Sequence, residues 1–141
     1  MRAWSGVPAG VAALRDHDAG GAMAEFALAG GVIAFLLLGI LEFGAAQWTK
    51  NNVASDAREG ARYAIVHGTR SGTVTDSAGV ANYVKAQSSL GSTIRVYAWW
   101  PNGTKVQDDP VVVSVAVSVP RRGPFIPAHK DSATSKMRIV Y

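Results

Sequence analysis

Residues 20–48, GGAMAEFALAGGVIAFLLLGILEFGAAQW, decide the fold that we predict for this chain. Sixteen consecutive residues between Glu25 and Glu42 carry no charge and no strongly polar group. Because about 20 helical residues cross a hydrocarbon core about 30 Å thick, this stretch is long enough to span a membrane. A backbone in lipid must satisfy its own hydrogen bonds, so we expect a transmembrane helix over residues 21–48. A buried helix of a soluble domain is the alternative.

The start of this stretch carries features that a plain membrane anchor does not need. Glu25 begins the apolar run, where a carboxylate costs free energy unless it reaches water or a partner. Gly20 and Gly21 form a small, flexible site in which a protease could bind the chain in an extended form. Residues 1–19 are polar and lack the apolar region of a secretory signal. We expect them to form a disordered leader.

Three motifs in this region resemble those of one family. Residues 20–26, GGAMAEF, are similar to the processing site of type IV prepilins, in the form Gly-x-x-x-x-Glu-Tyr/Phe of the Flp and Tad pilus systems. Residues 39–44, GILEFG, and residues 57–64, AREGARYA, resemble the two signature blocks of TadE-like pseudopilins. The resemblance covers most of residues 20–141. The second block, placed after a membrane helix that ends in Glu-Phe-Gly, makes the combination specific.

The resemblance implies a maturation step. A prepilin peptidase on the cytoplasmic side would cut after Gly20, which leaves Gly21 as the new N-terminus and Glu25 as the fifth residue, the register of the family. A cut after Gly21 would put Glu25 fourth, so we prefer Gly20. In an assembly without lipid, the new ammonium group can pair with Glu25 of a neighbouring subunit, so that neither charge stays unpaired. A carboxylate that only reaches the membrane edge is the alternative for Glu25.

The same resemblance places the parts of the chain and its partners. Residues 1–20 would be a cytoplasmic leader, residues 21–48 the single transmembrane helix, and residues 49–141 an extracytoplasmic head. The protein would lie in the cytoplasmic membrane, and in or at the tip of a pilus. Glu25, Phe26 and Glu42 would serve assembly with other pilins and pilus assembly proteins. The second signature block supplies five further site residues: Arg58, Glu59, Gly60, Arg62 and Tyr63.

The helix is expected to continue beyond the membrane to about Val66. Small residues recur there at three- and four-residue steps and form a narrow stripe that allows close packing. Its members are Ala54, Ala57, Ala61, Ala64 and Gly68. Glu59 and Arg62 lie off the stripe, at a spacing that predicts an i,i+3 ion pair. A long N-terminal helix, half in the membrane and half on a head, is the shape that pilins share.

The remaining residues predict a second helix and a sheet. Asp76 or Thr75 can cap a helix over residues 77–90. Alternating apolar residues predict strands at three places: residues 93–100, 111–119 and 132–141. The last strand would pair with the second, which is apolar enough on both faces to be central. We therefore expect an α+β fold of the pilin type, with helices packed on a small antiparallel sheet.

Two adjacent tryptophans, Trp99 and Trp100, should point to opposite faces of their strand. Trp100 shares a face with Ile94 and Val96, which is the face expected in the core. An exposed Trp99 would suit a binding hot spot. Coverage of Trp99 by a long loop or by a helix is the interpretation that we favour.

No residue pattern in the chain predicts catalysis. The sequence has no cysteine, which excludes a disulfide framework and a thiolate metal site. His17, His67 and His129 are far apart and share no spacing with a carboxylate. We find no phosphate-binding loop and no nucleophile–base arrangement. We therefore expect a protein that is not an enzyme, with no catalytic residue, no cofactor and no metal.

Positive charge is concentrated at the C-terminal end. Residues 1–120 hold nine Lys/Arg and nine Asp/Glu, so the net charge of +4 falls on residues 121–141. The charged residues there are Arg121, Arg122, Lys130, Lys136 and Arg138, against Asp131. Such a segment could meet phosphates, acidic lipid or an acidic partner. We favour solvated strand and loop edges and do not expect nucleic acid as a partner, because this segment has no interleaved aromatic platform on which bases could stack.

Three functions remain open on the sequence. A non-catalytic minor pilin or pseudopilin of a Tad-type (Flp) pilus or related secretion apparatus, matured by a prepilin peptidase, agrees with every motif. An uncleaved single-pass anchor with a partner-binding head would keep its leader. A membrane-tethered nucleic-acid binder would use the basic C-terminal segment, and its binding would depend steeply on salt.

Overall fold

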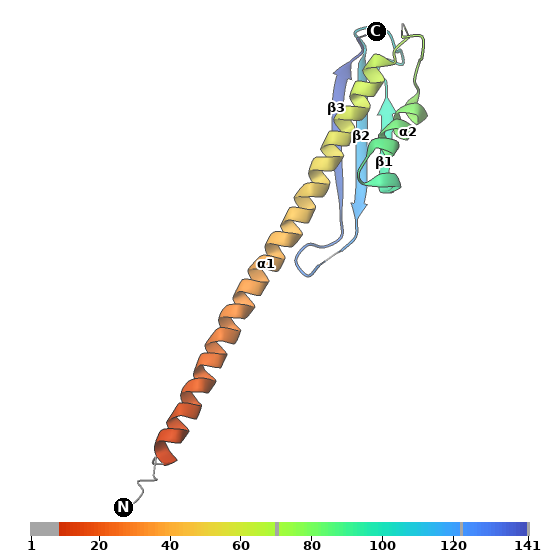
Figure 1. Ribbon diagram of the computed structural model, residues 1–141. Coiled ribbons are helices and arrows are strands. Elements are labelled where there is room, and N and C mark those ends of the chain that lie inside the picture. Colours follow the sequence, from red (N-terminus) through yellow and green to blue (C-terminus); the bar gives the residue numbers. More distant parts are fainter. Residues whose placement is uncertain (1–8, 70, 122, 141) are drawn as a thin grey trace, which may run out of the picture. The chain divides into compact units, whose positions relative to one another are not determined.

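The computed structural model describes residues 9–69, 71–121 and 123–140, with side chains from residue 20 onward. The first element is helix α1 (Ala9–Val66) (Figure 1). The chain divides into two compact units, one that ends at Leu41 and one that begins at Glu42.

The first unit is helical wherever it is described, and its apolar side chains are exposed. Phe26 is 80% exposed and Phe35 is 61% exposed. From Gly20 onward, α1 contains a window that is long and apolar enough to cross a membrane, and none of that window is buried within the chain. These properties agree with the long apolar helix that the sequence predicts.

The start of α1 differs from the sequence-based expectation. A disordered leader is the wrong description of residues 9–19, which form the first turns of α1. Four alanines and a leucine in this stretch favour a helix, and extending an existing helix costs far less than starting one. Residues 1–8 of the leader lie outside the described residues. Gly20 and Gly21 are also helical rather than extended.

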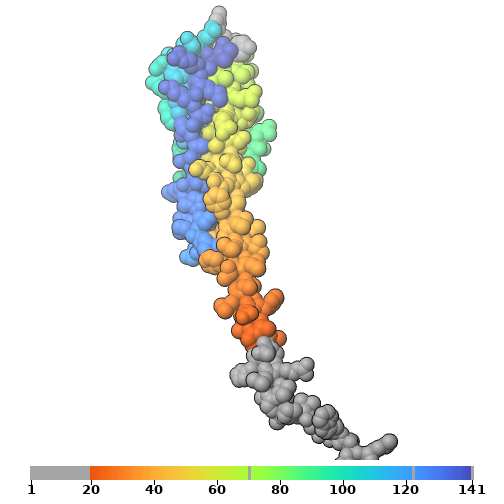
Figure 2. All heavy atoms as spheres, turned by 90° about the vertical axis from the view of Figure 1, so that its left-hand side faces the viewer, coloured from red at the N-terminus to blue at the C-terminus, as the bar shows by residue number. Residues whose placement is uncertain are grey.

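The second unit is the predicted α+β head. After α1 it contains two short helices and three strands: α2 (Ser77–Gln87), the 3-10 helix η1 (Gly91–Thr93), β1 (Ile94–Trp99), β2 (Pro110–Val119) and β3 (His129–Arg138). The strands form one antiparallel sheet in the order β1-β2-β3. Within this unit, α1 and α2 lie on one face of the sheet (Figures 1 and 2). The fold class is confirmed, although the last strand begins at His129 rather than at residue 132.

Strand β2 is central, as its sequence predicts. Its side chains are small or apolar on both faces, so neighbouring strands and helices can cover them. Val115 pairs with Val96 of β1 on one side and with Ala133 of β3 on the other. This register places the most apolar row of each strand toward the helices. A slip of one residue would turn that row to solvent.

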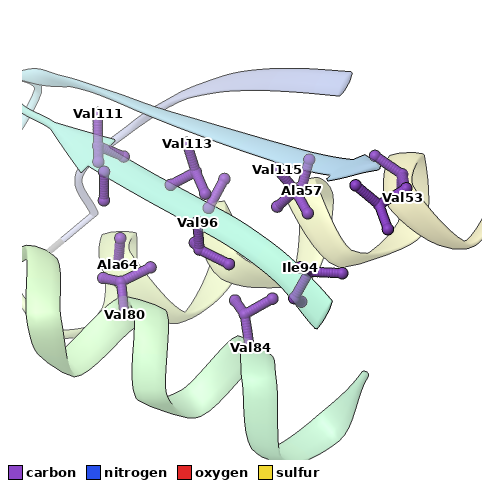
Figure 3. Packing of buried hydrophobic residues seen from close by; sticks show 13 residues of the cluster. Val53, Ala57, Ala64, Val80, Val84, Ile94, Val96, Val111, Val113 and Val115 are labelled. Carbon is purple, nitrogen blue, oxygen red and sulfur yellow. The ribbon is translucent and has the colours of Figure 1, made fainter. Parts of the chain in front are cut away.

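The core of the head lies between the sheet and the two helices. In Figure 3, Ala57 and Ala64 of α1 and Val80 and Val84 of α2 point toward the valines of β1 and β2. Burial of a valine side chain stabilises a fold by roughly 1.5–3 kcal/mol. The predicted small-residue stripe is therefore the core-facing stripe of α1, since Ala57, Ala61 and Ala64 are each at most 1% exposed.

Gly60 marks a point of close approach between α1 and the rest of the head. A Cβ atom at this position would lie 2.7 Å from Cγ2 of Val84 and 3.0 Å from Cγ1 of Val113. Contacts this short would force the valines or the helix to move, because protein cores are close-packed. Only glycine fits at this position without repacking.

The two tryptophans separate as predicted, but Trp99 is not covered. Trp100 packs against the core, and the ammonium group of Lys105 lies 4.5 Å from its ring centroid. Trp99 is 46% exposed on the opposite face of the sheet, so the interpretation that a loop or helix covers it is wrong. The loop after β1 is held elsewhere, because Lys105 Nζ donates to the carbonyl oxygen of Thr75 at 2.8 Å.

The substitution Gly60→Ala should destabilise the head, because the new methyl group overpacks the space beside Val84 and Val113. Overpacking costs about 1–3 kcal/mol, and alanine regains about 1 kcal/mol because it favours a helix more than glycine does. The free energy of unfolding should therefore fall by up to about 2 kcal/mol. Chemical denaturation measures this loss. Gly44→Ala is the matched control, since no atom lies within 4 Å of its Cβ position. Equal stability of the two variants would contradict the close packing at Gly60.

Candidate functional site

The residues of the predicted processing site lie on one exposed helical segment. Gly20, Gly21, Glu25 and Phe26 all belong to α1, and all four are exposed. No atom lies within 4 Å of the Cβ position of either glycine, so packing within the chain does not require glycine there. Glu25 has no hydrogen bond or ion pair with the described residues. This segment is therefore accessible to molecules outside the chain.

Glu42 holds a loop of its own head. Its Oε2 atom accepts the backbone N–H groups of Phe125 at 3.1 Å and of Ile126 at 3.0 Å, both in the loop between β2 and β3. A hydrogen bond to a charged group contributes about 1.5–3 kcal/mol when shielded and less at a surface. Glu42 is thus an anchor within the chain, and its contact with another subunit stays a prediction.

The loop between β2 and β3 is shaped to fit this carboxylate. A side chain at Gly123 would occupy the space that the Glu42 carboxylate fills. Arg121 fastens the same loop, since Nε donates to the carbonyl oxygen of Gly123 at 3.0 Å and Nη2 to that of Pro124 at 3.4 Å. Arg121 therefore contributes to loop structure. The neighbouring Arg122 lies outside the described residues.

Three members of the second signature block build the contact between α1 and α2. The Tyr83 hydroxyl donates to Oε1 of Glu59 at 3.1 Å. Tyr63 stacks on Tyr83 and on His67, with ring centroids 4.1 Å apart in both pairs. Gly60 allows the helices to come close enough for these contacts. The hydrogen bond to the Glu59 carboxylate raises the pKa of Tyr83 above its ordinary value.

The other two members, Arg58 and Arg62, remain on the surface. The predicted ion pair between Glu59 and Arg62 is wrong, because Glu59 bonds to Tyr83 and no ion pair joins it to Arg62 among the described residues. Residues three apart can pair on an isolated helix. Here a partner from α2 takes the carboxylate instead.

Two further polar contacts between α1 and the end of α2 are not identified by the sequence alone. Ser88 donates to Asp56 at 2.6 Å, and Ser89 donates to Asn52 at 2.9 Å. Positions 52, 56 and 59 are separated by four and three residues, so they share one face of α1. That spacing is the available signal in the sequence, but it does not reveal the partners, which directly follow α2.

The two histidines with described side chains make hydrogen bonds to the backbone of their own segment. His67 and His129 bond through Nδ1 to the backbone carbonyl oxygens of Tyr63 at 2.8 Å and Pro127 at 3.0 Å. Across the described ranges, no group of three or more His, Cys, Asp or Glu side chains could hold a metal ion. The geometry joins a long helix to a small head and fixes one loop.

Fold and site together define a protein whose long, apolar N-terminal helix is built into a small α+β head. The family model described as TadE-like protein matches residues 20–62, a segment that contains Gly20, Glu25, Glu42 and Gly60. The match confirms that the chain is TadE-like over this segment, as the motifs predict. The TadE-like family indicates a pilin-like protein associated with Tad pili. Comparison with curated proteins and with solved structures found no match.

The substitution Glu42→Ala should release the loop between β2 and β3, because the N–H groups of Phe125 and Ile126 lose their acceptor. Amide hydrogen exchange at these two positions should become about tenfold faster, which corresponds to about 1.4 kcal/mol. Gly123→Ala should have a similar effect, and the two changes together should be less than additive. Gln47→Ala removes an exposed polar side chain from the same helix as a control. Unchanged exchange in the Glu42 variant would refute the anchoring role.

Proposed function

We propose that the chain is a non-catalytic minor pilin or pseudopilin of a Tad-type (Flp) pilus or a related secretion apparatus. The observation that carries this proposal is the exposed apolar part of α1, residues 20–41, within the segment that matches the TadE-like family. A prepilin peptidase removes the leader after Gly20, and the mature helix enters the assembly. The protein crosses the cytoplasmic membrane once, with its leader inside and its head outside, and then reaches the pilus or its tip.

An apolar helix that is exposed along its length needs a cover. Phe26, Leu36 and Ile40 are 80%, 58% and 67% exposed. They belong to one continuous apolar surface, whereas soluble proteins normally expose apolar residues singly. Lipid can cover this helix before assembly, because a helix satisfies its own backbone hydrogen bonds. Neighbouring helices can cover it afterwards. The open Cβ positions at Gly30 and Gly31 support close packing of helices there.

Maturation accounts for the glycine pair and for the carboxylate at the start of this helix. Glycine inside a helix costs about 1 kcal/mol relative to alanine, so Gly20 and Gly21 form a weak point at which a peptidase can open the helix. Cleavage after Gly20 creates an ammonium group on Gly21. That group can pair with Glu25 of a neighbouring subunit, so neither charge is left alone in an apolar assembly.

The head contributes surfaces for binding partners and does not take part in catalysis. Glu59, Gly60 and Tyr63 serve the contact with α2. Arg58 and Arg62 are exposed, and these are the members of the signature block that can contact other pilins or pilus assembly proteins. Exposed arginines suit such contacts because a guanidinium group offers five donors in a fixed plane.

The mature N-terminus tests this proposal. Mass spectrometry should find a start at Gly21 when the chain is expressed with its peptidase, and an uncut chain without it. Gly20→Leu should abolish cleavage, because a bulky side chain replaces the glycine at the cut. Ala29→Leu adds the same side chain farther along the helix and should be cut like the unmodified chain.

Two outcomes separate the alternatives. A chain that keeps residues 1–20 in the presence of active peptidase would refute processing and favour an uncleaved anchor with a partner-binding head. Glu25→Gln separates maturation from assembly, because cleavage should proceed while recovery in the assembled fraction falls at least about tenfold for a lost buried charge pair. Normal assembly of this variant would refute the proposed role of Glu25.

A further inference from the structure

On the face of the sheet that points away from α1 and α2, no helix lies among the described residues, and long side chains of β1 and β3 are exposed. We name it the outer sheet face and define it by five exposed side chains: Arg95, Tyr97 and Trp99 of β1, and Lys130 and Lys136 of β3. The register places them together, since Trp99 pairs with Val112 of β2, and Val112 pairs with Lys136. Directly paired residues lie on the same face of a sheet. Residues two apart in each strand share that face as well.

The outer sheet face is positively charged. Arg95, Lys130 and Lys136 form no ion pair with a described residue, whereas Arg138 at the end of β3 lies 3.6 Å from Asp108. The acidic residue of β3, Asp131, occupies the alternate face, where it is less exposed and lies 3.4 Å from His129. The strands therefore present cations and no carboxylate on this side. Such a surface attracts an anionic ligand.

Two aromatic rings accompany these cations. Tyr97 is 57% exposed and Trp99 is 46% exposed. As residues two apart on one strand, they stand about 7 Å from each other along β1. That separation gives each ring room for its own stacking partner. Exposed aromatic rings on a sheet bind unpaired nucleic-acid bases by stacking, at about 1–3 kcal/mol per base.

A hollow in the outer sheet face lies between two of the cations. It has a volume of about 190 Å³, and Arg95 and Lys130 line it together with Ala116 and Ser118. The small side chains of β2 make the floor, and the long cationic side chains make the walls. A phosphate group in this hollow would meet a guanidinium, an ammonium and a hydroxyl group.

We propose that the outer sheet face binds single-stranded nucleic acid. Two bases stack on Tyr97 and Trp99, and the phosphates meet Arg95 and Lys130 in the hollow and Lys136 beside it. The C-terminal segment has no aromatic platform interleaved with its cations, but the sheet places β1, with Tyr97 and Trp99, in the same surface as Lys130 and Lys136. Duplex DNA fits less well, because its bases are paired and cannot lie on the rings. This binding goes beyond pilus assembly and does not depend on it.

The experiment uses the full chain in nanodiscs of phosphatidylcholine and a labelled twelve-nucleotide oligo(dT), with affinity measured by fluorescence anisotropy. Trp99→Ala should weaken binding about fivefold to a hundredfold, and Trp99→Phe should largely restore it, because phenylalanine keeps a stacking face. Lys130→Gln/Lys136→Gln should weaken binding and reduce the slope of log affinity against log salt by about 1.4. Lys50→Gln/Lys85→Gln removes the same charge from the helices and should bind like the unmodified chain.

Three results would overturn the proposal. The first is the absence of binding at about 50 mM salt, where phosphate contacts are strong. The second is unchanged affinity in Trp99→Ala, which would leave only diffuse attraction of charge. The third is equal competition by polygalacturonate or by duplex DNA at the same charge concentration, since neither presents unpaired bases. Circular dichroism of each variant separates lost binding from lost folding, and competition by duplex DNA tests base stacking in the case in which Trp99→Ala does not fold.

Discussion

Close packing of α1 at Gly60 is the constraint on which the head depends. Because a Cβ atom there would lie 2.7 Å from Val84, any other residue would push α1 away from α2 and β2. The neighbouring alanines 57, 61 and 64 continue this close contact along the helix. The distance that results brings Tyr83 within reach of Glu59 and lets Tyr63 stack on it. One glycine thus sets the spacing for the polar and aromatic contacts around it.

Local patterns account for the parts of the fold that the sequence predicts. The uncharged run before Glu42 indicates the apolar helix, and alternation identifies β2 as a central strand. Such local patterns do not identify hydrogen-bond partners that lie far apart in the sequence. Glu42 bonds to residues 83 and 84 positions away, and Glu59 takes Tyr83 rather than the nearby Arg62. Strand alternation predicts which face of the sheet carries Trp99, but whether another segment covers that face depends on tertiary packing, and here Trp99 is exposed.

The same helix presents two kinds of surface, and the account of function rests on that difference. From Phe26 to Leu41 its side chains are apolar and largely exposed, while from Val53 onward one stripe is buried against the head. The family match spans both kinds of surface, from the glycine pair to Arg62. Glu42 stands where the second unit begins, and it fastens a loop to the helix there. An exposed apolar helix in water is unfavourable, and the proposed function therefore covers the first surface with lipid or with neighbouring subunits.

Cysteine accessibility tests most directly whether lipid or neighbouring helices cover that surface. The chain has no cysteine, so each single substitution reports on one position. Leu36→Cys lies on the apolar part of α1, and Asn82→Cys lies on the exposed side of α2. In cells whose outer layers admit a membrane-impermeant maleimide, the account predicts labelling at position 82 and none at position 36. Equal labelling at both positions would contradict it.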